Sequence, residues 1–323
     1  MRVIVDSISG YLDLKHLKFF VLVSAFISLQ FLSCTNKSQN SNPKFQILDD
    51  VHVQVSFDTI PGRIISLAPN ITETLFAIGA GASVAGVTDL CDYPPEAKNK
   101  TKTGNYISPN YEVMVSLNPD LIIMNVENIS NPTYQALKNM GLKIYVSNAR
   151  NLDGIYKMIL DFGKITDKNT EAESLKNKLL ADHSKFSNNR HDKTPALILI
   201  SVNPLMTTNG KTFINDIINL TPLYNIYSDQ ALDYPNINYE DVIKKNPETI
   251  VFPTDTNEVL KTQKFADEIK RQLSNTAAVE NNNIILIDEN IMFRPGPRVF
   301  DAVRILREKL IHQKKNFSSP EQL

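Results

Sequence analysis

The sequence predicts an α/β protein made of two similar lobes with parallel-type sheets, joined by one long helix. Three observations support this fold class. Short apolar segments that suit buried strands alternate with segments of helical periodicity, which indicates sheets covered by helices on both faces. A unit consisting of a helix and the strand that follows it occurs twice. A long polar helix separates the two copies.

The repeated unit carries the same residue types at the same spacing. Its first copy begins with Asn110-Tyr111-Glu112 and continues with Asn118-Pro119-Asp120 before an apolar strand. Its second copy begins with Asn238-Tyr239-Glu240 and continues with Asn246-Pro247-Glu248 before another apolar strand. We therefore predict that each lobe contains one copy.

The predicted connecting helix runs from Asn169 to Ser187. Ala172, Leu175, Leu179 and Phe186 recur at helical spacing within a charged sequence, which predicts one apolar stripe on a polar helix. At about 1.5 Å per residue the helix spans on the order of 30 Å, the diameter of a small domain. We interpret it as a rigid strut between the lobes.

The remaining elements follow from periodicity and turn residues. A hairpin within 45–60 precedes strands at 63–67, 84–87, 121–124 and 143–146, with helices at 71–78, 111–117 and 133–140. The second half contains strands at 196–200, 250–252 and 284–287, helices at 213–220, 239–245 and 261–273, and a final amphipathic helix that begins at Pro295. We predict that Asn70 and Glu73 form a capping pair, and that Gly79 ends a helix.

Composition and charge exclude several classes of function. The 323 residues are 42% hydrophobic and 21% charged, with 34 basic and 35 acidic residues, so a nucleic-acid partner is not expected. The cysteines, Cys34 and Cys91, are too far apart for a metal-binding pair. None of the histidines falls at a predicted strand end; they are His16, His52, His183, His191 and His312. We predict no metal ligands and no cofactor.

The amino terminus, residues 1–33, has the features of a secretory signal peptide. Its apolar run, Phe19–Leu29, follows Lys15 and Lys18 and is too short to span a membrane. Leu32-Ser33-Cys34 resembles a bacterial lipobox, which implies that Cys34 is lipidated; the alternative is a plain signal peptide with an incidental cysteine. Residues 34–44 are polar and suit a flexible tether.

Enzymatic function finds little support in the sequence. There is no paired carboxylate at a predicted strand end, no phosphate-binding loop and no nucleophile beside a base. We therefore predict that the chain is not an enzyme. The alternatives are a two-lobed enzyme of the metallocluster reductase or nucleotide-sugar transferase type, and a surface scaffold without a small ligand.

Several segments in a fixed order resemble one family. They are Arg63–Glu73, Asp92–Ala97, Gly104–Tyr106, Pro109–Glu112, Leu117–Leu121 and Arg294–Arg298. Over about residues 45 to 312 the chain resembles the helical-strut substrate-binding proteins of ABC importers, the class that includes vitamin B12 and iron-siderophore binders. The resemblance implies two α/β lobes, a ligand cleft between them and only slight closure on binding.

The resemblance also implies a function and a location. The chain would be a lipid-anchored, extracytoplasmic and monomeric protein that captures a metal chelate, either a corrinoid such as cobalamin or a ferric siderophore or haem-like compound. It would deliver this chelate to a membrane permease and its ATPase. The expected organisation is an N-terminal lobe at 45–150, helices including the strut at 151–190, a C-terminal lobe at 191–315 and a disordered tail at 316–323.

The same resemblance supplies candidate ligand contacts. Tyr106 and Tyr234 stand where B12-binding relatives place tryptophans, and a tyrosine ring can stack on a flat chelate; alternatively both are ordinary surface-loop tyrosines. Met206 stands where relatives have an apolar ligand contact, although a core position is equally suitable. Arg294 and Asn290 follow a strand end, where a guanidinium suits carboxylate or phosphate groups. The alternative for Arg294 is a structural ion pair.

Two glutamates are candidates for permease docking. Glu112 and Glu240 each lie in the opening turn of a predicted helix, where the helix dipole alone favours a carboxylate. In the family, the matching glutamate of each lobe contacts arginines of the permease. Two exposed acids at corresponding points would give the complex its register and raise its rate of formation.

Overall fold

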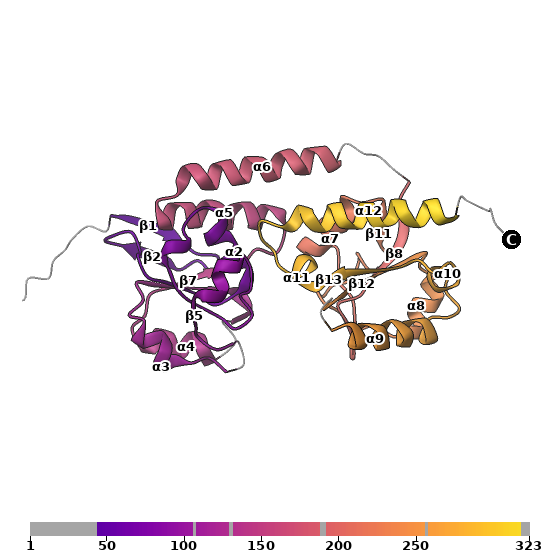
Figure 1. The fold of residues 1–323 in the computed structure, drawn as a ribbon, viewed down its shortest axis with the longest axis horizontal. Coiled ribbons are helices and arrows are strands. Elements are labelled where there is room, and N and C mark those ends of the chain that lie inside the picture. The colour runs from indigo at the N-terminus through magenta and orange to yellow at the C-terminus, as the bar shows by residue number, and fades with distance from the viewer. Residues whose placement is uncertain (1–43, 106–107, 129–131, 188–191, 256–257, 318–323) are drawn as a thin grey trace, which may run out of the picture. The chain divides into compact units, whose positions relative to one another are not determined.

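The structure, a computed structural model, describes residues 44–105, 108–128, 132–187, 192–255 and 258–317 (Figure 1). This part of the chain contains two separate parallel sheets, a five-stranded one of order β5-β4-β3-β6-β7 and a four-stranded one of order β11-β8-β12-β13. The predicted α/β fold with parallel sheets is confirmed. Among the described residues, none of the helices is both long and apolar enough to cross a membrane.

The N-terminal sheet follows a hairpin of β1 (Phe45–Leu48) and β2 (Gln54–Phe57). Its strands are β3 (Ile64–Ser66), β4 (Val84–Val87), β5 (Thr101–Lys102), β6 (Leu121–Asn125) and β7 (Ile144–Ser147). Its helices are α2 (Pro69–Ala77), α3 (Tyr111–Ser116), α4 (Pro132–Asn139) and α5 (Leu152–Thr166), with short 3-10 turns at Gly81–Ser83, Pro95–Asn99 and Val126–Asn128.

Alternating side chains of this sheet pack against helices on opposite faces. Ile65 and Ile122 contact the cluster that contains Met114 of α3 and Leu137 of α4. The neighbouring strand residues Ile64, Leu121 and Tyr145 belong to the cluster that contains residues of α2 and α5. Figure 1 shows α3 and α4 on the side of the sheet away from α5. Burial on both faces explains why these strands are apolar throughout.

The C-terminal sheet contains β8 (Thr194–Ile198), β11 (Leu223–Asn225), β12 (Thr249–Thr254) and β13 (Ile284–Asp288). A small antiparallel pair, β9 (Ser201–Val202) and β10 (Leu205–Met206), extends from β8. The surrounding helices are α7 (Phe213–Asn219), α8 (Tyr239–Lys245), α9 (Val259–Gln272), α10 (Ala277–Glu280), α11 (Glu289–Met292) and α12 (Val299–Phe317).

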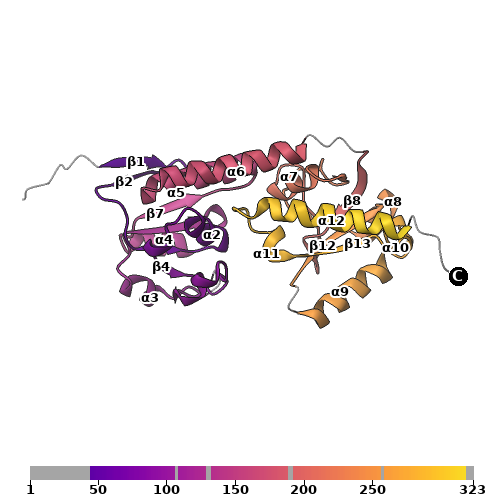
Figure 2. The same cartoon turned by 45° about the horizontal axis from the view of Figure 1, so that its top comes forward.

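This sheet is also covered on both faces. Leu197 and Ile250 pack in the cluster that contains Ile269 of α9, whereas Ile198 and Val251 pack in the cluster that contains residues of α7 and α12. Figure 2 shows α9 and α12 on opposite sides of β12 and β13. The C-terminal half thus repeats the layer order that the N-terminal half uses.

The connection between the two sheets consists of two packed helices, α5 and α6 (Asn169–Ser187). The bounds of α6 are those that the sequence predicted, and its Ala172, Leu179 and Phe186 are buried. A methyl group at Gly163 of α5 would lie 2.5 Å from Ala172 Cβ, so the glycine lets the two helices approach closely. One apolar cluster continues from the N-terminal sheet through α5 and α6 to the C-terminal sheet.

Both copies of the repeated unit adopt the same structure. The Asn110 side chain accepts from Val113 N at 3.1 Å and the Asn238 side chain accepts from Asp241 N at 2.8 Å, so each asparagine caps its helix. Asn118 and Asn246 both have positive φ, 44° and 46°, and the following proline leads into the strand. β6 and β12 each pair in parallel with the first strand of their sheet.

Two local predictions were wrong: the final helix, α12, begins at Val299 and not at Pro295, and the predicted capping pair of α2 does not form. Helix α2 begins at Pro69, its N-cap is Ala68 and no side chain caps it, so Asn70 and Glu73 are not a capping pair. Both are buried and contact residues from the far end of the chain, as described below. Gly79 does follow α2 with a φ of 77°, and Ala80 N donates to Leu75 O at 2.8 Å, as in a helix C-cap.

Candidate functional site

Each sheet has one point at which the strand order reverses direction. In the N-terminal sheet it lies between β3 and β6, and in the C-terminal sheet between β8 and β12. Ligands of open parallel sheets bind beyond the carboxyl ends of the strands at such points, because the loops there diverge and leave a crevice. The loops after β3, β6, β8 and β12 are therefore the first places to examine.

At the reversal point of the N-terminal sheet, two asparagines meet. Asn125, at the end of β6, donates from Nδ2 to Asn70 Oδ1 at 3.0 Å. Asn70 is 3% exposed, and its own Nδ2 donates to the carbonyl of Pro295 at 3.4 Å. The segment that precedes α12 is thereby attached to the N-terminal sheet, although it follows the last strand of the C-terminal one.

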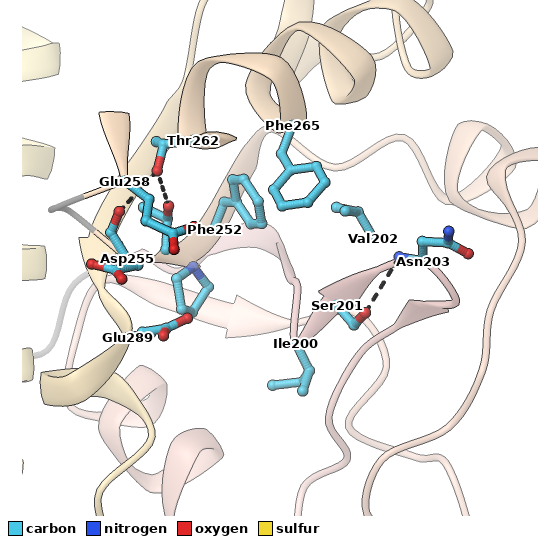
Figure 3. Close-up of a pocket in the computed structure, with 12 residues that line it drawn as sticks. Ile200, Ser201, Val202, Asn203, Phe252, Asp255, Glu258, Thr262, Phe265 and Glu289 are labelled. Atoms are coloured by element: carbon cyan, nitrogen blue, oxygen red, sulfur yellow. Dashed lines mark hydrogen bonds between the residues drawn. The ribbon is translucent and has the colours of Figure 1, made fainter. Parts of the chain in front are cut away.

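At the reversal point of the C-terminal sheet there is a cavity of about 200 Å³ (Figure 3). Its walls come from the loop after β8, the end of β12 and the start of α9. Phe252 and Phe265 form one side, with ring centroids 6.4 Å apart in an edge arrangement. The full lining is Ile200, Ser201, Val202, Asn203, Phe252, Pro253, Thr254, Asp255, Glu258, Thr262, Phe265 and Glu289.

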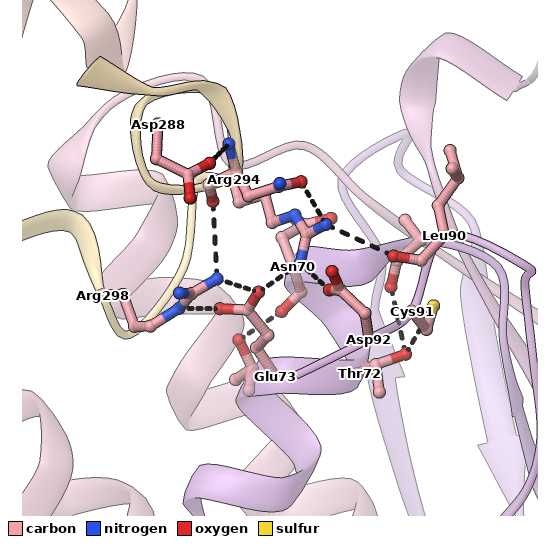
Figure 4. A network of polar contacts seen from close by, with 12 residues as sticks. Asn70, Thr72, Glu73, Leu90, Cys91, Asp92, Asp288, Arg294 and Arg298 are labelled. Carbon is pink, nitrogen blue, oxygen red and sulfur yellow. Dashed lines mark hydrogen bonds and ion pairs between the residues drawn. The ribbon is translucent and has the colours of Figure 1, made fainter. Parts of the chain in front are cut away.

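Arg294 and Arg298 form a polar network with the N-terminal half (Figure 4). Arg294 Nη1 lies 2.9 Å from Glu73 Oε1, and Arg298 Nη2 lies 2.6 Å from the same oxygen. Arg298 Nε also donates to Glu73 Oε2 at 2.8 Å. The Glu73 side chain is 2% exposed, so one buried carboxylate is neutralised by two guanidinium groups more than 200 residues away in sequence.

Three further side chains join this network. Arg294 Nη1 lies 2.6 Å from Asp92 Oδ1, and Arg294 Nη2 donates to Asn290 Oδ1. The Arg298 guanidinium lies over the Tyr93 ring, 4.1 Å from its centroid. Partial burial opposes ionisation of Asp92, but the hydrogen bond and charge of Arg294 outweigh it and lower the pKa of that carboxyl.

Asp233 and its neighbour Tyr234 lie near a second set of N-terminal residues. Arg150, shortly after β7, forms an ion pair with Asp233. Tyr234 is 43% exposed. Burial and the nearby Glu127 carboxylate raise the pKa of the Tyr234 hydroxyl, and Arg150 opposes this rise. The loop that carries Tyr234 therefore lies close to the carboxyl ends of β6 and β7.

Met206 lies beside the loop of Tyr234. It is half-buried, it pairs with Ser201 in the β9–β10 ladder, and it forms a bridge with Asn236. The structure thus brings together the segments of Met206 and Tyr234, and it joins Asn290 directly to Arg294. Tyr106 and Cys34 lie outside the described residues.

The candidate docking residues Glu112 and Glu240 occupy equivalent positions. Each is the second residue of its helix, α3 or α8, and each is exposed. Both helices lie directly before the strand next to the reversal point of their sheet. In the described part of the chain, no group of three or more His, Cys, Asp and Glu residues is arranged to hold a metal ion.

Sequence reasoning missed the partners of Arg294. Glu73 was interpreted as a helix cap, and Asp92 was noted only within a family segment, although both ion-pair with Arg294. A usable signal existed for Glu73, because it is the one charged residue of its helix and both of its neighbours are buried, and a buried carboxylate needs a cationic partner. Arg150 and Asp233 carried no comparable signal.

The fold and these strand-end loops define a two-lobed binding protein. A family model for the periplasmic binding proteins matches residues 64–291. This match includes strands of both parallel sheets, β3 through β13, and both helices of the connection. The chain belongs to the periplasmic binding protein family.

Known proteins similar to the chain include two relatives and one solved structure. A vitamin B12-binding protein of Vibrio parahaemolyticus is 29% identical over 249 residues, which are 75% of this chain and 86% of that protein. An ABC transporter substrate-binding lipoprotein of Bacillus subtilis, itself uncharacterised, is 28% identical over 286 residues, 85% of this chain and 88% of that protein. A possible iron-binding, periplasmic solute-binding protein of Staphylococcus epidermidis is 27% identical with a TM-score of 0.68, covering 78% of this chain and 99% of that one.

Proposed function

We propose that this protein is the substrate-binding component of an ABC importer and captures a metal chelate, which it delivers to a membrane permease and its ATPase. One observation carries the proposal. Loops at the carboxyl ends of both sheets contact each other, through Arg294 with Asp92 and through Arg150 with Asp233. These contacts lie at the carboxyl ends of the strands, the side on which parallel sheets bind ligands, and they support a protein that holds one ligand between two lobes.

The ligand class rests on the relatives and on the side chains at these loops. One relative binds vitamin B12, and the similar solved structure is that of a possible iron-binding protein. We propose a corrinoid, or a ferric siderophore or haem-like compound. Tyr106, Met206 and Tyr234 would supply aromatic and apolar contacts. Asn290 and Arg294 would supply polar ones.

We further propose that the protein is anchored outside the cytoplasm by lipid. Residues 1–33 would be removed as a signal peptide, Cys34 would carry the acyl chains and residues 34–44 would form the tether. The lipoprotein relative of Bacillus subtilis supports this proposal. The lobes would then comprise residues 45–150 and 191–315, with residues 151–190 connecting them, and the protein would act as a monomer.

The direct test of capture is retention of a coloured ligand. The mature protein is incubated separately with cyanocobalamin, haemin and a ferric siderophore, then desalted, and its absorption spectrum is recorded. We expect one of these chromophores to stay with the protein at about one per chain. Loss of all three chromophores on desalting would contradict the proposal, and chemical conversion of any of them would favour an enzyme.

Tyr234 offers a prediction with a matched control. Replacing it in Tyr234→Ala should weaken binding of the retained chelate by roughly twofold to tenfold, because an aromatic contact contributes about 0.5–1.5 kcal/mol beyond its buried area. Tyr224 of β11 is exposed to nearly the same extent, 44% against 43%, and Tyr224→Ala should leave affinity unchanged. Fluorescence titration of both variants decides the point, and equal affinities would remove Tyr234 from the site.

A further inference from the structure

Both terminal nitrogens of the Arg294 guanidinium have hydrogen-bond partners within the protein. Nη1 contacts Glu73 at 2.9 Å and Asp92 at 2.6 Å, while Nη2 donates to the Leu90 carbonyl at 3.3 Å and to the Asn290 amide oxygen (Figure 4). The Arg294 side chain is 11% exposed. An anionic ligand can therefore reach this guanidinium only if one of the present partners leaves.

The four partners differ in how easily they can leave. Glu73 is 2% exposed and shared with Arg298, so its departure would leave poorly exposed charges without a partner. Asn290 belongs to α11 and Leu90 contributes a backbone carbonyl. Asp92 is different, because its side chain is 49% exposed and water can replace the guanidinium around an exposed carboxylate at little cost.

We propose that Asp92 is a built-in competitor for ligand anions: its carboxylate occupies the open face of Arg294, and a ligand carboxylate or phosphate must displace it. The proposal rests on the proposed function only in assuming that the ligand approaches these strand-end loops. It makes Asp92 a residue that sets specificity. Ligands whose acidic group binds the guanidinium more strongly than one exposed carboxylate would be retained, and neutral or weakly bound groups would be excluded.

The electrostatics of the loop support this role. Burial opposes the charge of Asp92, yet the hydrogen bond and charge of Arg294 prevail and lower the pKa of the carboxyl from its ordinary value. Asp92 is consequently ionised throughout the neutral pH range and competes there at full strength. Glu73, the second carboxylate of the network, pairs with Arg298. The charge of Arg298 therefore stays balanced when Asp92 moves away from Arg294.

The test uses inorganic phosphate as the probe, so that it does not depend on knowing the chelate. Binding is followed by NMR of the Arg294 guanidinium in the mature wild-type protein, in Asp92→Asn and in Asp89→Asn. Asp89 is an exposed acid three residues earlier on the same loop, so its variant reproduces the change in net charge. The asparagine in Asp92→Asn keeps an amide oxygen that can accept from Arg294, which preserves the local fold.

We expect phosphate to bind at Arg294 in Asp92→Asn with an affinity on the order of tenfold above that of the wild type, the gain from removing one charged competitor. Asp89→Asn should behave as the wild type does. Equal phosphate binding in all three proteins would overturn the proposal. So would a gain of the same size in Asp89→Asn, since it would show a general charge effect.

A second arm separates this proposal from the proposed function. Haemin carries two carboxylates and haemin dimethyl ester carries none, so Asp92→Asn should strengthen binding of haemin relative to its ester. If none of the chelates is retained by any variant, the proposed function fails, while the phosphate titration still decides whether Asp92 competes for Arg294. An equal change for haemin and its ester would contradict the competitor role.

Discussion

At the scale of single residues, Glu73 shows how a buried charge organises this protein. Its carboxylate accepts from Arg294 once and from Arg298 twice, at 2.6 to 2.9 Å. A buried carboxylate is unfavourable unless it is paired. Once paired, it fixes the position of the chain before α12 against α2. Tyr93 adds a ring beneath Arg298, so the C-terminal segment is held from two sides.

The Glu73 network predicts a large loss of stability on neutralisation. Glu73→Gln should lower the free energy of unfolding by about 3 kcal/mol, because two poorly exposed guanidinium groups lose their shared counter-charge. Glu96, an exposed acid on the neighbouring loop, provides the control, and Glu96→Gln should change stability by less than about 0.5 kcal/mol. Urea unfolding measures both. A loss below about 1 kcal/mol for Glu73→Gln would show that water solvates the arginines adequately.

At the scale of elements, sequence patterns predicted the bounds of a helix correctly where the interactions that define those bounds are local. The bounds of α6 and α8 match the predictions residue for residue, because their caps and periodicity lie within the segment itself. The repeated asparagine and proline positions also formed the same turns in both halves. The failures were contacts between distant segments. Asn70 and Glu73 satisfied a capping pattern in sequence, but long-range hydrogen bonds took their side chains elsewhere.

The equivalent helices α3 and α8 lead to a prediction about docking to the permease. Changing Glu112 and Glu240 together to alanine should leave chelate affinity within about threefold (under ~0.7 kcal/mol), because both side chains are exposed in the first turns of their helices. The same change should abolish uptake by cells that carry the cognate permease, since both contact points are lost.

Glu96 and Glu280 supply a matched pair of exposed acids, one from each half of the chain. The double alanine variant of that pair should support normal uptake and normal binding. A parallel loss of binding and uptake in the Glu112 and Glu240 variant would reject the docking role. Normal uptake by that variant would reject it equally.

At the scale of the whole molecule, the two sheets are linked by contacts that periodicity and spacing alone cannot locate. Arg294 and Asp92 are 202 residues apart and Arg298 and Glu73 are 225 apart, so their pairing depends on how the complete chain folds. Sequence patterns could predict two lobes and a connecting helix because each sheet satisfies its own hydrogen bonds. They predicted helices in the connection and left a structural ion pair open for Arg294, but they could not identify Glu73 and Asp92 as its partners.

These contacts suggest how the molecule would hold its ligand. The loops at the strand ends of both sheets would hold a chelate between them. α5 and α6, embedded in one continuous apolar cluster, would limit how far the two halves can separate. A protein of this kind depends on a pre-formed site, because little binding energy is then spent on ordering the chain.

The most direct measurement is the position of the chelated metal in a crystal of the protein loaded with the retained chromophore. Anomalous scattering at the cobalt or iron absorption edge locates that atom without assumptions about the ligand. We expect a single strong peak between the carboxyl ends of the two sheets, with the ligand in contact with Tyr234 and with its acidic group at Arg294. A metal peak on the outer helices, or at the opposite ends of the strands, would contradict the account.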